Sequence, residues 1–209
     1  MKAYITPLGF DSSQIISLIV KYGIEEGDRI VLIRPRDEMD SRAEATIDAV
    51  TNLSRQISSA IEVNIHRVDH RDFEGMVLSF VDLIKITPGQ IVANISGGPR
   101  EIFLAFAVAC LSQSGRIYKT TNFSDIDRTL REITLPNITY ECDEKSRAVL
   151  QDINDNQPTT VTHIAKRLDV SESTISRQVS RLEEIKSIRV LQKGKTKEIT
   201  ISLTGKMLL

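Results

Sequence analysis

The most chemically promising segment of the sequence is Asn94-Ile95-Ser96-Gly97-Gly98-Pro99-Arg100, which follows a short apolar run. Its two glycines permit unusual dihedral angles and close approach of the backbone to a ligand, and Pro99 suits the first turn of a helix, where its missing N–H costs nothing. The amides and dipole of such a helix start favour negative charge, and Ser96 and Arg100 add donors for phosphate or ribose. We therefore expect an anion-binding loop here; the alternative is a tight turn with no ligand.

A second turn of similar character, Thr6-Pro7-Leu8-Gly9-Phe10-Asp11-Ser12, follows the first apolar run of the chain. In open parallel sheets, ligands bind beyond the carboxyl ends of the strands, where the strand order reverses. With the common order 3-2-1-4-5, strands one and four are neighbours. Both turns then border one crevice.

Other kinds of site find little support in the sequence. It contains neither G-x-x-x-x-G-K-[ST] nor G-x-G-x-x-G, which argues against an ATPase loop and a dinucleotide fingerprint. Ser96 lacks the G-x-S-x-G elbow of a hydrolase. The four-residue spacing of His66 and His70 belongs to a helix, but the two fall in or just after a predicted strand, so a metal site is not expected. We predict no catalytic residue and no cofactor, although acid–base work by Asp11 stays open.

Positioning these turns requires an α/β fold. Short runs rich in Val and Ile alternate with helical patterns, which indicates parallel strands joined by right-handed crossovers. The predicted first domain is a Rossmann-like, open, mainly parallel sheet. Its predicted strands are 2–6, 29–34, 61–68, 90–95, 116–121 and 130–135, and its predicted helices are 12–22, 41–59, 73–86 and 99–113.

Two details of this domain are further expectations. The helix over 99–113 is apolar almost throughout, which indicates burial on more than one side, in the fold or in a dimer. The second strand ends in Arg34 and Arg36, where a dinucleotide-binding protein would favour an acidic residue. We expect these arginines to pair on the surface with Asp37, Glu38 and Asp40.

Composition limits the class of protein. The 209 residues are 41% hydrophobic and 26% charged, with a mean hydropathy of −0.12, and no uncharged apolar run reaches the about 18 residues that could span a bilayer. The first residues resemble no secretory signal, so the expected location is cytoplasmic, with no membrane partner. Cys110 and Cys142 form no C-x-x-C motif, which argues against a disulfide framework or a zinc site.

Charge divides the chain into two parts. Residues 1–144 contain 15 Lys and Arg against 21 Asp and Glu, whereas residues 145–209 contain 12 against 7, a balance of +5. A basic part of this size points to a polyanionic partner, with an ordinary solvated surface as the alternative.

The basic part has the layout of a winged helix-turn-helix. A helix is predicted at 144–153, a helix-turn-helix within 160–187, and a hairpin of 188–191 and 199–203 around Gly194. The internal face is predicted from Ile164, Leu168, Val170, Ile175, Val179 and Leu182, with the small Ala165 at the helix crossing and Ser171 as the cap of the second helix. Hydroxyls and arginines suited to phosphates and base edges remain outside, and lysines occupy the hairpin tip. The expected DNA-binding residues are Ser171, Ser173, Thr174, Ser176, Arg177, Ser180, Arg181, Lys193, Lys195 and Lys197.

The chain resembles the archaeal CRISPR-associated transcription regulators that carry a CARF domain, the CRISPR-associated Rossmann fold. The resemblance lies in three features: T-P-L-G-F-D after strand one, N-I-S-G-G-P-R-E after strand four, and the winged helix that follows. The resemblance spans nearly the whole chain. It implies a sensing and dimerisation domain over 1–136, a linker over 137–143 and a DNA-binding domain over 144–209. Pro99 departs from the pattern, since many relatives have Thr there and thus one more hydroxyl donor.

Members of this family form homodimers and are thought to sense cyclic tetra-adenylate. The resemblance therefore implies a homodimeric, ligand-responsive regulator of CRISPR genes that binds double-stranded promoter DNA and a cyclic oligoadenylate. The alternatives are a ring nuclease that cleaves the cyclic ligand and a regulator that senses another nucleotide or small anion. The implied ligand contacts are Thr6, Pro7, Leu8, Gly9, Phe10, Asp11, Ser12, Asn94, Ser96, Gly97, Gly98, Pro99 and Arg100.

Overall fold

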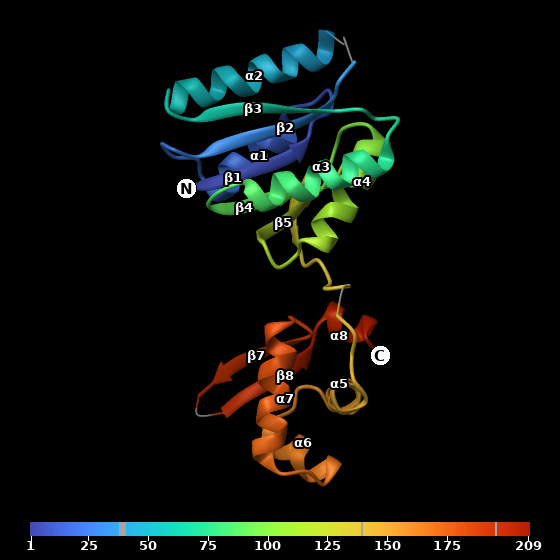
Figure 1. Ribbon diagram of the computed structural model, residues 1–209. Coiled ribbons are helices and arrows are strands. Elements are labelled where there is room, and N and C mark those ends of the chain that lie inside the picture. Colours follow the sequence, from blue (N-terminus) through green and yellow to red (C-terminus); the bar gives the residue numbers. More distant parts are fainter. Residues whose placement is uncertain (38–40, 139, 195) are drawn as a thin grey trace. The chain divides into compact units, whose positions relative to one another are not determined.

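The computed structural model describes residues 1–37, 41–138, 140–194 and 196–209, and the chain forms two compact units, Met1–Thr134 and Leu135–Leu209 (Figure 1). Residues of the expected linker 137–143 pack within the second unit. There, the backbone N–H of Asn137 donates to Thr204 Oγ1 over 3.1 Å.

The first unit is a six-stranded sheet in the order β3-β2-β1-β4-β5-β6. Neighbouring strands run parallel except β5 and β6, which are antiparallel. Strands one and four are therefore neighbours, as expected from the common doubly wound order, and the order reverses between them. The strands are β1 (Lys2–Pro7), β2 (Arg29–Pro35), β3 (Glu62–Val68), β4 (Gln90–Asn94), β5 (Ile117–Phe123) and β6 (Leu130–Ile133).

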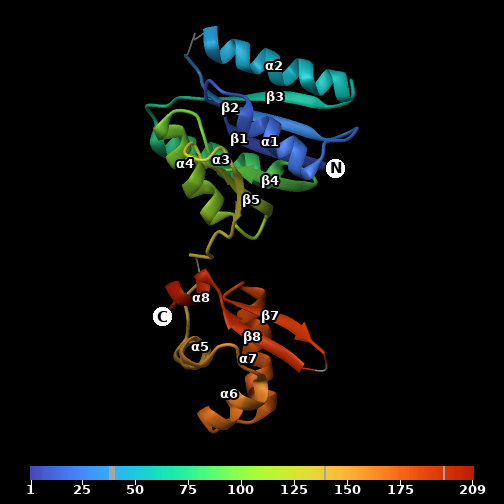
Figure 2. The same cartoon turned by 180° about the vertical axis from the view of Figure 1, so that it is seen from behind.

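Four helices cover the two faces of this sheet (Figures 1 and 2). On one face, apolar residues of α1 and α2 pack with Tyr4, Ile30 and Leu32 in a buried core. On the other face α3 packs against α4, where the Phe80 and Phe106 rings meet edge to face with centroids 5.6 Å apart. The helices are α1 (Ser13–Tyr22), α2 (Ser41–Ile57), α3 (Phe73–Ile86) and α4 (Arg100–Ser112).

The last strand of the sheet is fastened to α1 by its polar side chains. Glu132 of β6 accepts a hydrogen bond from Tyr22 Oη (2.9 Å) and pairs with Lys119 (2.9 Å) and Lys21 (3.9 Å). Hydrogen bonds from Lys119 and Tyr22 lower the pKa of the Glu132 carboxyl. This edge strand is thus held to the helix that follows the first loop.

The second unit has the expected winged helix-turn-helix order. Three helices are followed by a β-hairpin and a short terminal helix that the sequence patterns did not predict. The elements are α5 (Glu144–Asn156), α6 (Val161–Leu168), α7 (Glu172–Glu184), β7 (Ile188–Lys193), β8 (Thr196–Ile201) and α8 (Leu203–Met207). No helix within the described ranges is long and apolar enough to cross a membrane.

The core of this unit confirms most of the predicted internal face and corrects it at one position. Ile164, Ile175 and Leu182 are fully or almost fully buried, whereas Val170 is 38% exposed. The reason is that α6 ends at Leu168 and Asp169 adopts a left-handed conformation (φ 53°), so Val170 lies in the turn, outside the helical periodicity.

Candidate ligand pocket and DNA-binding surface

The two glycine-containing loops of the first unit are in contact. A Cβ added to Gly9 would lie 3.3 Å from the Gly98 nitrogen, and one added to Gly98 would lie 2.9 Å from Pro7 Cβ. Gly97 and Gly98 both have positive φ (74° and 71°), a conformation that side chains disfavour. The two loops therefore meet at the ends of strands one and four, as the strand order predicts, and their close approach depends on glycine.

Buried polar side chains fix the loops from beneath. Asn94 Nδ2 donates to Thr6 Oγ1 (3.1 Å) and to Gln14 Oε1 (3.3 Å), while Asn94 Oδ1 accepts from Thr121 Oγ1 (3.1 Å). Gln14 Nε2 donates to the Pro7 carbonyl over 3.0 Å. This network connects both strand ends to the first turn of α1.

Several of the expected ligand contacts therefore lie inside the protein. Thr6, Leu8 and Asn94 are fully buried, and Ser96 is 5% exposed. Ser96 Oγ accepts from the Phe123 amide (2.5 Å) and from Asn122 Nδ2 (3.3 Å). As the structure stands, these four side chains hold the loops, and the groups turned toward solvent are Phe10, Asp11, Gly97 and Arg100.

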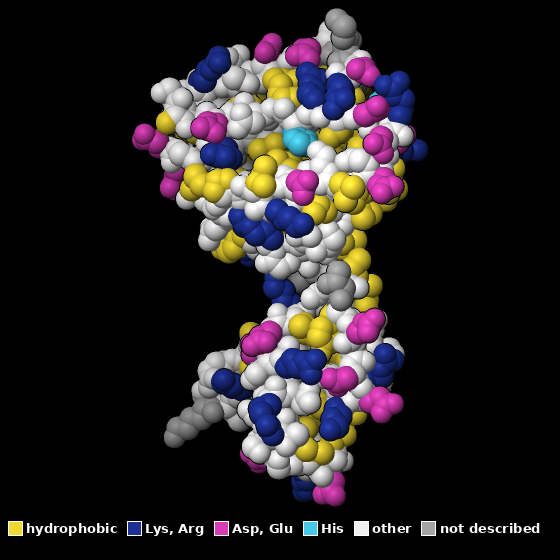
Figure 3. Space-filling model, viewed as in Figure 1, with side chains coloured by type: hydrophobic (Ala, Val, Ile, Leu, Met, Phe, Trp, Pro, Cys, Tyr) yellow, Lys and Arg dark blue, Asp and Glu magenta, His cyan; other side chains and the backbone are white. Residues whose placement is uncertain are grey.

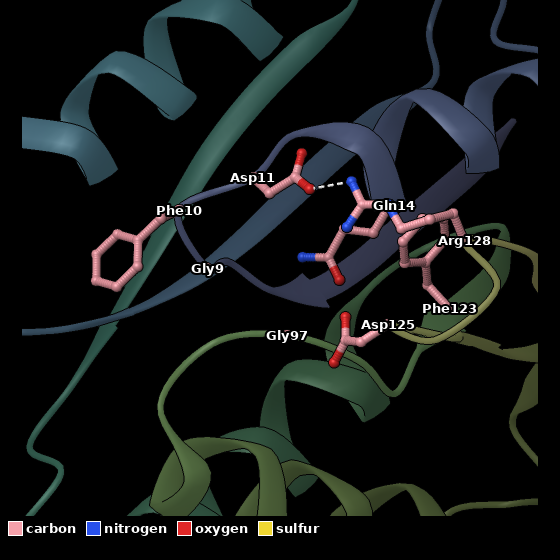
Figure 4. Close-up of a pocket in the computed structure, with 8 residues that line it drawn as sticks. All are labelled: Gly9, Phe10, Asp11, Gln14, Gly97, Phe123, Asp125 and Arg128. Carbon is pink, nitrogen blue, oxygen red and sulfur yellow. Dashed lines mark hydrogen bonds and ion pairs between the residues drawn. The ribbon is translucent and has the colours of Figure 1, made fainter.

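A pocket of about 150 Å³ opens between the loops (Figure 4). Three of its lining residues come from the first loop, one from α1 and one from the second loop. The others come from the end of β5 and the turn that follows it. The ring of Phe10 points away from the pocket in this view, whereas the Asp125 carboxylate is directed toward it. The lining residues are Gly9, Phe10, Asp11, Gln14, Gly97, Phe123, Asp125 and Arg128.

An ion pair crosses this pocket. Arg128 Nη2 donates to Asp11 and to Ser13 Oγ (3.0 Å), and the guanidinium lies over the Phe123 ring, 5.2 Å from its centroid. Hydrogen bonds from Ser13 and Arg128 lower the pKa of the Asp11 carboxyl to about 2, so it is ionised at neutral pH. Arg128 itself has positive φ (58°).

The second loop leads into the N-terminus of α4. Helix α4 begins at Arg100, so Pro99 is the N-cap and lies just outside the first turn rather than within it as expected. Within the described part of the chain no side chain caps this helix, which leaves its first amides available to an anion. Arg100 is exposed beside them, although the pocket lining does not include it.

Arg34 was expected on the surface, and this expectation is wrong. Its side chain is 1% exposed, and Nη1 donates to the Leu8 carbonyl over 3.3 Å. Because Leu8 is in the first loop, this buried arginine helps to fix the backbone of that loop by its hydrogen bond to the Leu8 carbonyl. Asp37 pairs instead with Arg71 (2.8 Å), and Glu38 and Asp40 lie outside the described residues.

The histidines show no metal-binding arrangement. His66 Nε2 lies 2.8 Å from Ser79 Oγ, and burial lowers the pKa of its imidazole, whereas His70 is exposed. Within the described ranges, no cluster of three His, Cys, Asp or Glu side chains could hold a metal ion.

In the second unit, α7 exposes the predicted polar face. Ser171 caps the helix by accepting from the Thr174 amide (3.3 Å), and its hydroxyl contacts those of Ser173 (3.1 Å) and Thr174 (2.9 Å). Ser176, Arg177, Ser180 and Arg181 are exposed along the same helix. Lys and Arg side chains also lie over α7 and the hairpin in Figure 3.

The basic residues of this surface differ in whether they form an ion pair with an acidic side chain. Arg181 Nη1 lies 3.1 Å from Asp143 Oδ2, and Lys193 pairs with Glu198 over 3.0 Å. Arg177 and Lys197 form no ion pair with the described residues, and Lys195 lies outside them. Arg177 is therefore the arginine on this helix most available to a phosphate or a base edge.

This geometry defines a class of protein: a Rossmann-like domain with a loop pocket at its switch point, followed by a winged helix-turn-helix. The model of the Csa3 CRISPR-associated Rossmann-like domain matches residues 2–125, and the MarR family model matches residues 145–193. The chain belongs to the family defined by this Csa3 domain and is a CRISPR-associated DNA-binding regulator.

A relative from Saccharolobus solfataricus, described as "CRISPR locus-related putative DNA-binding protein Csa3", is 23% identical over 213 residues, which cover 98% of this chain and 86% of the relative. Among solved structures, Enterococcus italicus Csm6 bound to cyclic hexa-2'-fluoro-hexa-dAMP matches 89% of this chain with 12% identity and a TM-score of 0.54. A Vibrio cholerae protein matches with 8% identity and a TM-score of 0.46. This chain spans 52% and 64% of those two chains.

Four pocket residues, Gln14, Phe123, Asp125 and Arg128, were not among the predicted ligand contacts. Gln14 could have been found as a polar residue on the apolar face of α1, where it is buried with Ile15 and Leu18. Asp125 and Arg128 lie in a turn between strands, where no spacing rule places them near the first loop. Their approach follows only from the three-dimensional path of β5 and β6.

Proposed function

We propose that this protein is a homodimeric transcriptional regulator of CRISPR-Cas genes that binds double-stranded DNA and senses a cyclic oligoadenylate, with cyclic tetra-adenylate as the expected ligand. The observation on which the proposal depends is the contact between the two glycine loops beside the uncapped start of α4. Backbone amides at a helix start and the exposed Arg100 suit the phosphates of such a ligand.

The ligand class is supported at the level of the fold. Csm6, which has a similar fold, was solved bound to a cyclic hexanucleotide analogue. The pocket of about 150 Å³ in one copy is smaller than the roughly 300–1,000 Å³ of typical small-molecule sites. A cyclic tetranucleotide therefore needs two such pockets, and a two-fold dimer supplies the same loops twice around one axis.

The helix that starts at the pocket also offers a surface for a second copy. Leu104 is 53% exposed on α4, and Phe103 and Val108 are 36% and 37% exposed beside it. Exposed apolar side chains gathered on one helix mark an interaction surface more often than scattered ones do. Pairing two copies through α4 would place both pockets close to the dimer axis.

The polar, basic face of α7 is the proposed reading surface for DNA. A dimer presents two such helices, which have to match half-sites about 34 Å apart or a multiple of that spacing. A ligand that prefers one dimer geometry would then change the affinity for DNA.

Replacement of Arg100 by Ala tests the pocket. We expect cyclic tetra-adenylate to bind about tenfold more weakly by calorimetry, because charge-assisted hydrogen bonds to phosphate are lost, while DNA affinity without ligand stays within about twofold. The matched control is Arg55→Ala, an exposed arginine of α2 that does not line the pocket. Equal ligand affinity of the Arg100 variant and the wild type would contradict the proposed phosphate contact.

The regulator is proposed to bind its ligand without cleaving it. Chromatography of cyclic tetra-adenylate after incubation with the protein separates a sensor from a ring nuclease. Recovery of the intact ring supports the sensor, whereas linear products would make the ring nuclease the better description. Absence of binding to any cyclic oligoadenylate, with a thermal shift by another nucleotide, would reassign the ligand class.

A further inference from the structure

One stretch of chain begins in the pocket and ends at the proposed DNA-reading helix. Arg128 lies in the turn between β5 and β6 and lines the pocket. The chain then forms β6 and enters the second unit at Leu135. Residues 128–143 are therefore the stretch of chain that connects the pocket to the DNA-binding domain.

At the pocket end, Arg128 is the only lysine or arginine among the lining residues, which also include the carboxylates of Asp11 and Asp125. It is already paired with Asp11 across the opening (Figure 4). An anion that enters the pocket thus meets a guanidinium whose partner is a carboxylate, and it has to compete with that carboxylate.

The competition favours a phosphate. The Arg128 and Asp11 side chains are 54% and 52% exposed, and ion pairs this exposed contribute little to stability. Phosphate, like carboxylate, can accept two parallel charge-assisted hydrogen bonds from a guanidinium, and a ligand held by the loop amides presents it at high local concentration. Replacement of Asp11 by a phosphate as the partner of Arg128 should therefore change the stability of the fold little.

The exchange would release the contact that holds the turn of the β5–β6 hairpin to the start of α1, while the contacts of β6 with Lys21 and Tyr22 at the end of α1 remain. Arg128 holds the turn of the hairpin to Asp11 and Ser13 at the start of α1. Glu132 holds β6 to Tyr22 at the end of that helix. When Arg128 turns to a ligand, the turn of the hairpin can follow it while Glu132 still anchors the strand.

At the other end, the same stretch contacts α7. Asp143 caps α5 by accepting from the Ser146 amide (2.7 Å), and its other oxygen pairs with Arg181 over 3.1 Å. The Arg181 guanidinium also lies 5.7 Å from the Tyr140 ring centroid. Displacement of the segment from Leu135 to Asp143 would therefore disturb an arginine on the proposed DNA-reading face.

We propose that Arg128 is a ligand-sensing residue that exchanges Asp11 for a phosphate of the bound anion, and that residues 129–143 transmit this exchange to α7 through Asp143 and Arg181. This inference rests on the proposed function and adds to it the sensing residue and the route.

Calorimetry with cyclic tetra-adenylate and the full-length protein tests the exchange. Arg128→Ala is expected to weaken binding about tenfold, because a phosphate partner is lost. Asp11→Asn is expected to tighten binding about threefold, because the competitor loses its charge while the amide oxygen can still accept from Ser13. In the Arg128→Ala background, Asp11→Asn is expected to change ligand affinity less than twofold, since there is no longer an arginine for Asp11 to hold away from the ligand.

Arg131→Ala is the matched control. Arg131 belongs to the same hairpin and pairs with Asp127, but it does not line the pocket, so its loss should leave ligand affinity unchanged. If wild-type protein binds the ligand while Arg128→Ala and Asp11→Asn both weaken binding, the pair is structural and the exchange is overturned. If wild-type protein does not bind, the proposed ligand is overturned, and this inference with it.

Cys142 supplies a native reporter for the transmission. Its thiol is partly exposed within the Leu135–Asp143 segment, whereas Cys110 is fully buried. Saturating ligand is expected to change the rate of Cys142 modification by a thiol reagent at least about twofold in the wild type and not in Arg128→Ala. An unchanged wild-type rate at saturation, or the same change in the variant, would overturn the route through residues 129–143.

Discussion

Three arginines of the second unit illustrate how local surroundings decide a side chain's role. Arg167 forms a two-point ion pair with Asp152, with Nε–Oδ1 at 2.8 Å and Nη2–Oδ2 at 2.7 Å, and so joins α6 to α5. Arg181 pairs with Asp143, and Arg177 forms no ion pair with the described residues. We infer that Arg167 serves the fold and that Arg177 is the most available to DNA.

Arg177→Ala should therefore weaken DNA binding more than Arg181→Ala, which removes the other arginine of α7. If the guanidinium contacts a phosphate, the slope of log K against log salt should fall by about 1 in magnitude, and loss of a base contact should cost about 1–3 kcal/mol. Gel-shift or fluorescence titrations at several salt concentrations measure both quantities. Arg55→Ala on α2 is the control, and a variant with wild-type affinity and slope would contradict the assignment of α7 as the reading helix.

At the scale of elements, the strands and helices of both units were largely predictable because apolar periodicity and turn residues agree along the chain. The central residues of the buried strands β1, β2 and β4 form continuous apolar runs, 3–5, 30–33 and 91–93, and Ser171 marks the start of α7. The short α8 was missed because five residues carry too little periodicity to distinguish a helix from a turn.

The pocket was predictable only in part. The two glycine loops could be predicted because each follows an apolar strand, and the parallel topology brings the carboxyl ends of these two strands together. The position of Arg128 depends on how the β5–β6 hairpin folds back, and the burial of Arg34 depends on a contact with Leu8. Such long-range contacts leave no periodic signal in the sequence.

The second loop offers a direct test of the glycine requirement. Gly98→Ala places a Cβ 2.9 Å from Pro7 Cβ on a backbone with φ of 71°, so we expect a loss of about 1–3 kcal/mol in the free energy of unfolding and weaker ligand binding. Gly115→Ala is the matched control, because its Cβ would meet nothing within 4 Å. Urea unfolding of both variants measures the difference, and equal stability would show that the loops tolerate a side chain at their contact.

At the scale of the whole molecule, charge separates the two tasks. Residues 1–144 have a surplus of six acidic residues and residues 145–209 a surplus of five basic ones. Under the proposed function, the acidic part would disfavour an extended polyanion and would bind a small anion only in a defined pocket of amides and arginines. The basic part attracts a polyanion over a broad surface, and dimerisation would double that attraction.

The assembly itself can be tested through the exposed face of α4. Leu104→Glu introduces a charge at a side chain that is 53% exposed, so the fold should tolerate it, whereas burial of that charge between two copies would be costly. We expect analytical ultracentrifugation to show monomers in place of dimers, DNA affinity to fall about tenfold or more, and ligand affinity to fall with it because each copy supplies half of the site. Val20→Glu is the control, since Val20 is 79% exposed on α1, away from the pocket lining. A Leu104→Glu protein that sediments as a dimer would exclude α4 as the interface, and a monomer with wild-type affinity for cyclic tetra-adenylate would show that one copy forms a complete site.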